Sequence, residues 1–198
     1  MLHTHGYVQF PSHLNTAELL REYTESQSVS YTIFNYQQGK LDDEKRKQCN
    51  LDCRYKWVKS MMKAIQTAIL PHTTLKVTRP CIITSDARCQ QQHWHTDYDP
   101  KECGLPDDSA PLGLILAFES GTTLDIQPKE SKTPIRLAIP VGDILLFRGD
   151  LIHAGSPYKK RNSRLHMYVE DAAFRRALNR TYLETSTILP SYRMKITR

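Results

Sequence analysis

The sequence lacks any hydrophobic run that approaches the ~18 apolar residues needed to span a membrane. It also lacks internal repeats, low-complexity tracts and linkers rich in Gly and Ser. Its first residues, from Met1 to Gly6, do not show the basic and then apolar layout of a secretory signal. These absences predict a single domain over residues 1–198 that lies inside the cell, in the cytoplasm or the nucleus, with no membrane partner.

Cysteine is scarce, and the five cysteines are an odd number spread widely along the chain. A disulfide framework would need an even and more regularly spaced set, so disulfides are not expected. We expect free, inert thiols and a reducing compartment.

Basic charge is concentrated in the last fifth of the chain. Residues 159–198 hold ten basic and three acidic residues, a net charge of +7, whereas the whole chain carries +6, so the preceding residues sum to −1. Such an asymmetry is typical of a surface that binds a polyanion, either nucleic acid or an acidic protein, but a solvated face has the same composition. Both interpretations stay open on the sequence alone.

Helical patterns dominate the first third of the chain. Residues 15–18 have the form of a capping box, and apolar residues follow it at helical spacing. A second helix is predicted from about Asp43 to Leu70, because apolar residues recur every three or four positions between Tyr55 and Ile69. We therefore expect residues 1–72 to be mostly helical support.

From Leu75 onward the pattern changes to that of short strands. Strands are predicted near residues 75–84, 92–98, 112–118, 122–127, 134–139, 143–148, 151–154 and 163–170, most of them separated by Gly, Pro, Asn or Asp. This spacing predicts an all-β core over residues 73–170, a sandwich or jelly roll with flanking helices. Residues 171–198 would form a basic C-terminal extension.

The spacing His95-x-Asp97 carries the chemical information. Residues i and i+2 of a strand project to the same side, so an imidazole and a carboxylate can converge on one ion. His153 is the third ligand that we expect. Two histidines and a carboxylate on one face of an octahedron leave three positions open, as a non-haem Fe(II) oxygenase needs for a cosubstrate and dioxygen.

The order His95-x-Asp97, His153 and then Arg164 resembles the pattern of the 2-oxoglutarate and Fe(II)-dependent dioxygenase superfamily. Residues 121–128 and 140–147 are similar to stretches of its phytanoyl-CoA hydroxylase-like branch. The resemblance covers about residues 75–170.

The resemblance implies a double-stranded β-helix, a cupin-like jelly roll, with Fe(II) held by His95, Asp97 and His153. It also implies 2-oxoglutarate as cosubstrate, with its distal carboxylate on Arg164, since a guanidinium binds a carboxylate in bidentate fashion. Oxidative decarboxylation to succinate and CO2 would then be coupled, through O2, to hydroxylation or demethylation of a substrate. His166 stands where several branches have Ser and is expected to be a second contact to the cosubstrate.

Further residues near these motifs are candidates for contact with the substrate. Gln92, Trp94 and Tyr98 flank the ligands and are predicted to line the substrate pocket. Arg161 is the alternative anchor for the cosubstrate. The substrate itself is left open as a small molecule, a protein side chain or a modified nucleic acid.

Two other classes of function compete with this interpretation. A cupin-type metalloprotein would hold its ion with His93, His95 and His153, although such proteins usually have a Glu where this chain has Asp99 and Pro100. A non-catalytic module on the same fold would instead use the basic residues 159–198 to bind nucleic acid or protein.

Overall fold

The computed structural model describes residues 2–26, 32–33, 44–98, 110–131, 133–171 and 181–183. Residues 99–109, between the strands predicted near 92–98 and 112–118, lie outside the described residues, together with most of the predicted extension over 171–198.

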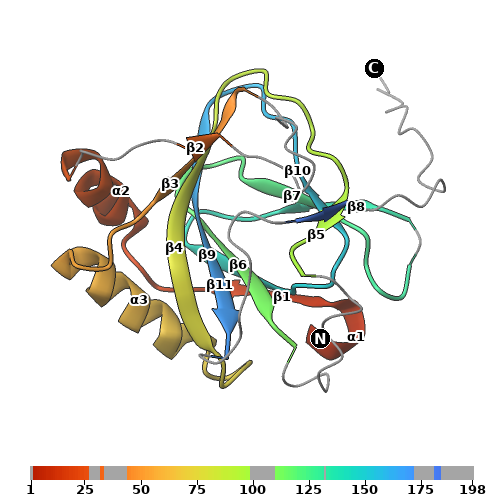
Figure 1. The fold of residues 1–198 in the computed structure, drawn as a ribbon, viewed down its shortest axis with the longest axis horizontal. Coiled ribbons are helices and arrows are strands. Elements are labelled where there is room, and N and C mark those ends of the chain that lie inside the picture. Colours follow the sequence, from red (N-terminus) through yellow and green to blue (C-terminus); the bar gives the residue numbers. More distant parts are fainter. Residues whose placement is uncertain are drawn as a thin grey trace.

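Two antiparallel sheets make up the described core (Figure 1). The strands of the larger sheet are β1 (Tyr7–Pro11), β2 (Thr32–Ile33), β3 (Arg46–Asn50), β4 (Lys76–Ser85), β6 (Leu112–Ala117), β9 (Asp143–Arg148) and β11 (Asn162–Glu170). They are arranged in the order β1-β9-β6-β11-β4-β3-β2. The strands of the smaller sheet are β5 (His95–Thr96), β7 (Thr123–Ile126), β8 (Ile135–Ala138), β10 (His153–Gly155) and β12 (Tyr182–Leu183). Their order is β12-β5-β10-β7-β8.

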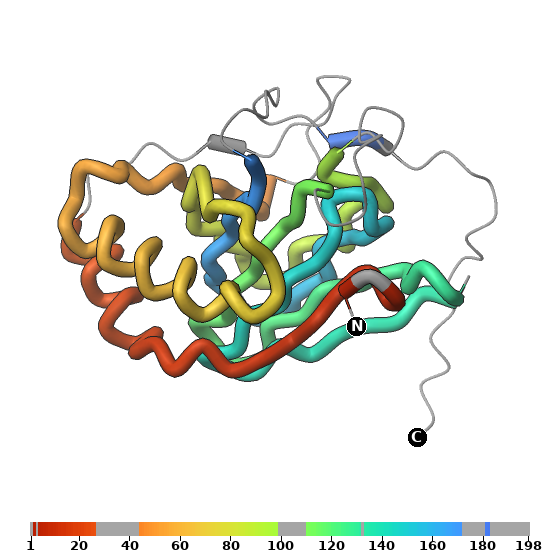
Figure 2. Tube along the Cα trace, turned by 90° about the horizontal axis from the view of Figure 1, so that it is seen from below, coloured from red at the N-terminus to blue at the C-terminus, as the bar shows by residue number. Residues whose placement is uncertain are grey.

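Helices cover one side of the larger sheet. The short α1 (Leu2–His5) precedes β1, while α2 (Thr16–Glu25) and α3 (Lys56–Ile69) lie together against the sheet (Figures 1 and 2). The capping interaction predicted for α2 is confirmed, because the Asn15 side chain accepts a hydrogen bond from the Glu18 amide at 3.2 Å. None of the helices in the described ranges is long and apolar enough to cross a bilayer.

The central strands of the larger sheet are buried on both faces, and alternation divides their side chains between two cores. Leu114 and Leu116 of β6 belong to the cluster that contains the buried face of α3, whereas Ile115 and Ala117 belong to the cluster between the sheets. The same division holds along β9, whereas β11 contributes Leu165, Met167 and Val169 to the helix-side cluster only. Because successive residues of a strand point to opposite faces, an uninterrupted apolar run supplies the helix layer and the space between the sheets at once.

The predicted helix over 43–70 is wrong in its first half. Residues 46–50 form β3, which pairs with β4 in the register Arg46↔Ser85 to Asn50↔Cys81. A turn then separates β3 from α3, with the Asp52 side chain accepting a hydrogen bond from the Arg54 amide at 2.8 Å. Asp in such a turn mimics a backbone turn, and pairing with the open edge of β4 outweighs the helical propensity of this segment.

Residues 1–72 also contribute more than helical support, since β1 was not predicted. It pairs with β9 from Tyr7↔Phe147 to Pro11↔Asp143, so the N-terminal segment extends the larger sheet at one edge while β3 and β2 extend it at the other. The strand predicted over 92–98 is shorter than expected, because only His95 and Thr96 pair within the smaller sheet.

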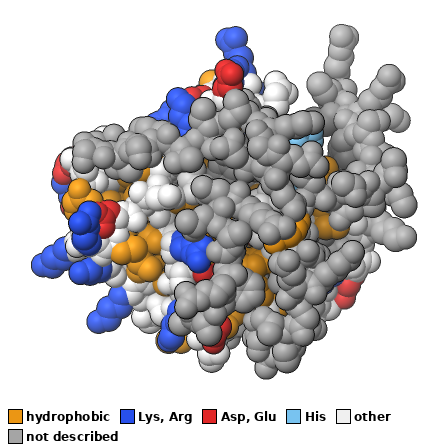
Figure 3. Space-filling model, viewed as in Figure 1, with side chains coloured by type: hydrophobic (Ala, Val, Ile, Leu, Met, Phe, Trp, Pro, Cys, Tyr) orange, Lys and Arg blue, Asp and Glu red, His pale blue; other side chains and the backbone are white. Residues whose placement is uncertain are grey.

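The basic residues of 159–198 that the structure describes do not share one environment. Lys159, Lys160 and Arg161 are exposed, whereas Arg164 is buried. On the face drawn in Figure 3, Lys and Arg side chains stand at several separate places with acidic side chains beside some of them. A surface for a polyanion therefore stays a prediction from composition.

Gly149, in the turn after β9, holds the segment that follows β5. Its carbonyl oxygen accepts hydrogen bonds from the amides of Asp97, at 3.0 Å, and Tyr98, at 3.1 Å. A Cβ at position 149 would lie 2.1 Å from Tyr98 Cδ2 and 2.9 Å from the backbone oxygen of Pro111. No side chain fits there unless this segment moves.

We expect Gly149→Ala to lower the free energy of unfolding by about 1–3 kcal/mol, because overpacking against Tyr98 and a backbone oxygen forces a local shift. Chemical denaturation of the metal-free protein measures this. Gly142→Ala is the matched control: an added Cβ meets nothing within 4 Å there, and only the positive φ of 86° is unfavourable. A Gly149→Ala protein as stable as the parent would contradict the assigned packing.

Candidate metal centre

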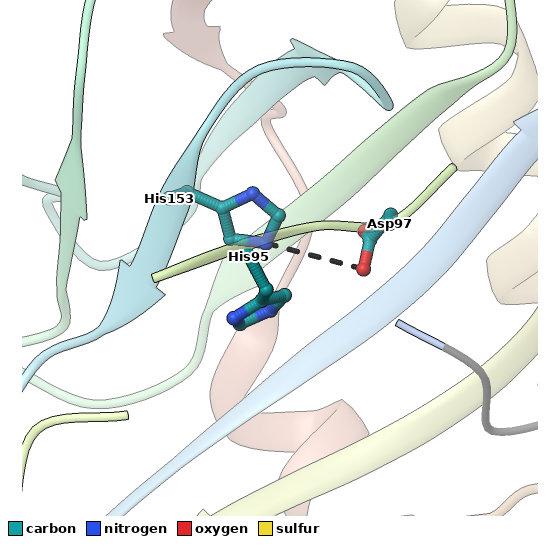
Figure 4. Close-up of side chains that lie close together, drawn as sticks. All are labelled: His95, Asp97 and His153. Atoms are coloured by element: carbon teal, nitrogen blue, oxygen red, sulfur yellow. Dashed lines mark ion pairs between the residues drawn. The ribbon is translucent and has the colours of Figure 1, made fainter. Parts of the chain in front are cut away.

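His95, Asp97 and His153 converge from two neighbouring strands of the smaller sheet (Figure 4). His95 and His153 are direct partners in the antiparallel pairing of β5 with β10, and their ring centroids lie 4.4 Å apart. Asp97 follows β5, with Oδ1 at 3.9 Å from His153 Nε2. One ligand atom from each residue lies within 4.8 Å of the others, and all three side chains are buried.

Hydrogen bonds fix the orientation of both imidazoles. His95 Nδ1 lies 2.7 Å from the carbonyl oxygen of His93, and His153 Nδ1 lies 2.9 Å from that of Leu151. A carbonyl oxygen only accepts, so Nδ1 carries the proton in each ring and the lone pair of the neutral ring is on Nε2. This pairing with a backbone carbonyl is usual for metal-binding histidines, since it sets the tautomer and the ring orientation.

The electrostatics also suit a metal ion. Burial, with a smaller contribution from the neighbouring His153, lowers the pKa of His95 from 6.5 to about 3. His95 is therefore neutral at pH 7, as a metal ligand must be. Two neutral imidazoles with a carboxylate form a donor set that fits non-haem iron and related divalent metals. Within the described residues no other cluster of His, Cys, Asp and Glu meets the same distance criterion.

The three residues line a cavity between the two sheets, with an empty volume of about 410 Å³ that includes its opening to solvent. Arg164 and His166 of β11 line the same cavity, as does Tyr168. Alternation along β11 places the intervening residues on the opposite face, because Leu165, Met167 and Val169 lie in the core beneath the helices. Four apolar side chains complete the lining of the cavity: Ile83, Ile115, Leu124 and Phe147. The sequence did not predict them as pocket residues.

Arg164 is a buried cation, with 3% of its surface exposed. Its Nη1 donates to Ser85 Oγ at 3.1 Å, and its guanidinium lies 5.2 Å from the centre of the Tyr158 ring. Burial is the main cause that lowers the pKa of Arg164. No carboxylate of the described residues forms an ion pair with it, so the buried charge favours an anion in the cavity.

His166 and Gln92 occupy different parts of this cavity. His166 Nε2 lies 3.7 Å from Asp97 Oδ2, so the ring stands beside the Asp97 carboxylate. The side-chain Oε1 of Gln92 accepts a hydrogen bond from the backbone amide of Gly155 at 2.9 Å. The backbone amide of Gln92 donates to the carbonyl oxygen of Gly155, also at 2.9 Å. These two bonds tie the segment before β5 to the end of β10.

The other predicted pocket residues lie elsewhere. Tyr98 is buried, and its hydroxyl donates to Glu170 Oε2 at 2.7 Å, so it joins the segment after Asp97 to the end of β11. Neither Tyr98 nor Trp94 is among the residues that line the cavity. His93 and Arg161, the alternative ligand and the alternative anchor, are both exposed and outside it.

Comparison with known proteins identifies the fold. No family model matches the chain, and no curated protein matches it in sequence. A prolyl hydroxylase from Trichoplax adhaerens, solved with a hypoxia-inducible factor peptide, superimposes with a TM-score of 0.67 at 13% identity over 86% of each chain. A prolyl-4-hydroxylase from Pseudomonas putida gives a TM-score of 0.61 at 14% identity, covering 86% of this chain and 95% of its own.

HygX from Streptomyces hygroscopicus, solved with nickel and 2-oxoglutarate, gives a TM-score of 0.65 at 8% identity, covering 87% of this chain and 85% of its own. At such identities these likenesses show the fold, and the predicted all-β jelly roll of the double-stranded β-helix type is confirmed. The phytanoyl-CoA hydroxylase-like branch stays a prediction.

We expect the metal-free protein to bind one equivalent of Ni(II) or Co(II), and His153→Ala to weaken that binding by more than about 100-fold. Losing a ligand should cost more than the 10–100-fold typical of outer-shell changes. Calorimetric titration measures the affinity. His93→Ala is the matched control, because its side chain is exposed and outside the cluster. Equal losses in the two variants would contradict the assigned ligand set.

Proposed function

We propose that the chain is an Fe(II)- and 2-oxoglutarate-dependent oxygenase. The observation that supports this most directly is that a buried two-histidine, one-carboxylate cluster and the buried cation of Arg164 line one cavity. A three-residue metal site alone serves many reactions. Here the metal would keep open coordination positions, which suits a cosubstrate that chelates it. The nearby Arg164 guanidinium forms no ion pair with a described carboxylate, which suits a cosubstrate that also has a second, anionic group.

In this proposal Fe(II) is held by the Nε2 atoms of His95 and His153 and by the carboxylate of Asp97. When bound, the metal and the cosubstrate supply the activation of O2, with conversion of 2-oxoglutarate to succinate and CO2 and oxidation of a substrate C–H bond. Because Asp97 fills the position that a halide takes in related halogenases, hydroxylation or demethylation is the reaction we propose.

The chain's own residues bind and orient the cosubstrate. Arg164 donates two parallel hydrogen bonds to the distal carboxylate in our proposal, which fixes both its position and its orientation. The apolar side chains of Ile115, Leu124 and Phe147, which line the cavity, would exclude water around the cosubstrate and so strengthen the charge–charge interaction. His166 stays a predicted second contact, and it also stands beside Asp97.

The solved structures support this class of activity. Two of the structurally similar proteins are prolyl hydroxylases, and a third was crystallised with nickel and 2-oxoglutarate. The cupin alternative is not favoured, because it requires His93, whose side chain is exposed and outside the cluster. Among the molecules bound in these similar structures are a hypoxia-inducible factor peptide and hygromycin B. Both a protein side chain and a small molecule are therefore compatible substrates.

Adding 2-oxoglutarate to the Fe(II)-loaded protein under nitrogen should produce a weak metal-to-ligand charge-transfer band in the visible spectrum. Admission of O2 should then yield succinate even without the substrate, by slow uncoupled turnover. His153→Ala should remove both signals, and His93→Ala should retain them. Absence of both signals from the parent protein at saturating Fe(II) would exclude the proposed activity.

Arg164→Met should weaken 2-oxoglutarate binding at least about 10-fold, because a charge-assisted bidentate contact contributes about 1.5–3 kcal/mol. The charge-transfer band, titrated with 2-oxoglutarate under nitrogen, measures the dissociation constant, and metal affinity should stay near that of the parent. Arg161→Met is the matched control, since it removes an exposed Arg on the segment that leads into β11. A larger loss in the Arg161 variant would transfer the anchor to that residue.

A further inference from the structure

A second arginine lies fully buried close to Arg164. Arg46 of β3 has 0% of its surface exposed. Its Nε donates to Ser85 Oγ at 3.2 Å, and its Nη2 donates to the carbonyl oxygens of Gln90 at 3.0 Å and Ser156 at 3.1 Å. Arg46 lies in the segment from about Asp43 to Leu70 for which the sequence predicts a helix.

Arg46 and Arg164 share one acceptor. Both donate to Ser85 Oγ, Arg46 from β3 on one side of β4 and Arg164 from β11 on the other. The register explains this, because Arg46 pairs with Ser85 while Arg164 pairs with Ile83, and paired residues project to the same face. The two cations interact, since the charge of Arg46 adds to the burial that lowers the pKa of Arg164.

Arg46 is not itself one of the residues that line the cavity, but its guanidinium lies against Gly155, which is. A Cβ added to Gly155 would lie 2.8 Å from Arg46 Nη1 and 2.2 Å from Gln92 Oε1. Both Gly155 and Gln92 line the cavity that contains the metal ligands. Glycine at position 155 is what allows the guanidinium to approach β10 this closely.

We propose that Arg46 is a second cation of the anion site, and that the Arg46–Arg164 pair makes the cavity selective for a 2-oxo acid with a distal carboxylate. The inference deepens the proposed function and rests on it. Two desolvated cations of like sign repel each other, and an anion between them offsets that repulsion. A carboxylate has about four lone-pair sites, enough to accept from both guanidinium groups.

The competing explanation is structural, because Arg46 also ties β3 to the carbonyl groups of Gln90 and Ser156. Charge selectivity separates the two explanations. Suitable probes are 2-oxoglutarate and 2-oxopentanoate, which chelate a metal alike and have the same chain length, but 2-oxopentanoate ends in a methyl group. A structural defect weakens the binding of both probes, whereas loss of a cation weakens only the binding of 2-oxoglutarate, which has the distal carboxylate.

The experiment measures the dissociation constants of both probes by calorimetry on the Ni(II)-loaded protein. The parent should prefer 2-oxoglutarate strongly. Arg164→Met should still bind 2-oxoglutarate at least about 10-fold more tightly than 2-oxopentanoate, because Arg46 supplies one charge-assisted contact. In the double variant Arg46→Met/Arg164→Met, the two dissociation constants should agree within about twofold. If Arg164→Met alone abolishes the preference, the proposal for Arg46 is wrong.

Single substitutions of Arg46 give a second, independent test. Arg46→Met should reduce the preference for 2-oxoglutarate at least about fivefold with 2-oxopentanoate binding unchanged, while Arg46→Lys, which keeps the charge, should retain most of it. Equal weakening of both probes by Arg46→Met would assign a structural role and overturn the proposal. If Arg46→Met does not fold, the Arg164→Met measurement decides. A parent protein that shows no preference, or binds neither probe, refutes the proposed function instead.

Discussion

The antiparallel pairing of β5 with β10 is the constraint on which the candidate site depends. It sets the two imidazoles opposite each other at His95 and His153, although β5 is only two residues long. A slip of one residue would turn His153 to the other face of the sheet. Two bonds between Gln92 and Gly155 hold the register on one side, and the Gly149 carbonyl holds Asp97 on the other. The cluster is therefore fixed by the backbone.

The strands with the longest apolar runs were predicted well. The bounds of β4, β6, β9 and β11 lie within one residue of those expected at each end. Burial on both faces gives these strands long apolar runs that are easy to recognise in the sequence. The candidate metal ligands could also be found from the sequence, since the His-x-Asp spacing is local. The error over 43–55 has a different origin. That segment has no strand-like alternation of its own, and its conformation comes from pairing with β4.

Arg46 illustrates what sequence reasoning could not reach. Its partners Ser85, Gln90 and Ser156 lie 39, 44 and 110 positions away in the chain. No local spacing connects these residues, and a buried cation cannot be told from a solvated one by residue type. Arg164 was identifiable only through its distance from His153 in a known pattern. A cavity lined by residues of seven strands can be recognised only once the strands are paired.

The pairing of β1 with β9 has a consequence for how the molecule forms. Tyr7 lies beside Phe147, and the Phe147 ring packs edge-on against His153 with centroids 4.9 Å apart. Contacts between such distant parts of the chain make folding slow, because loop-closure entropy is lost before the contacts form. On a ribosome, the ligands contributed by β5 and β10 cannot be enclosed until β11 has also emerged. Under the proposed function, metal binding would then follow the synthesis of β11, and the ion would stabilise only the finished structure.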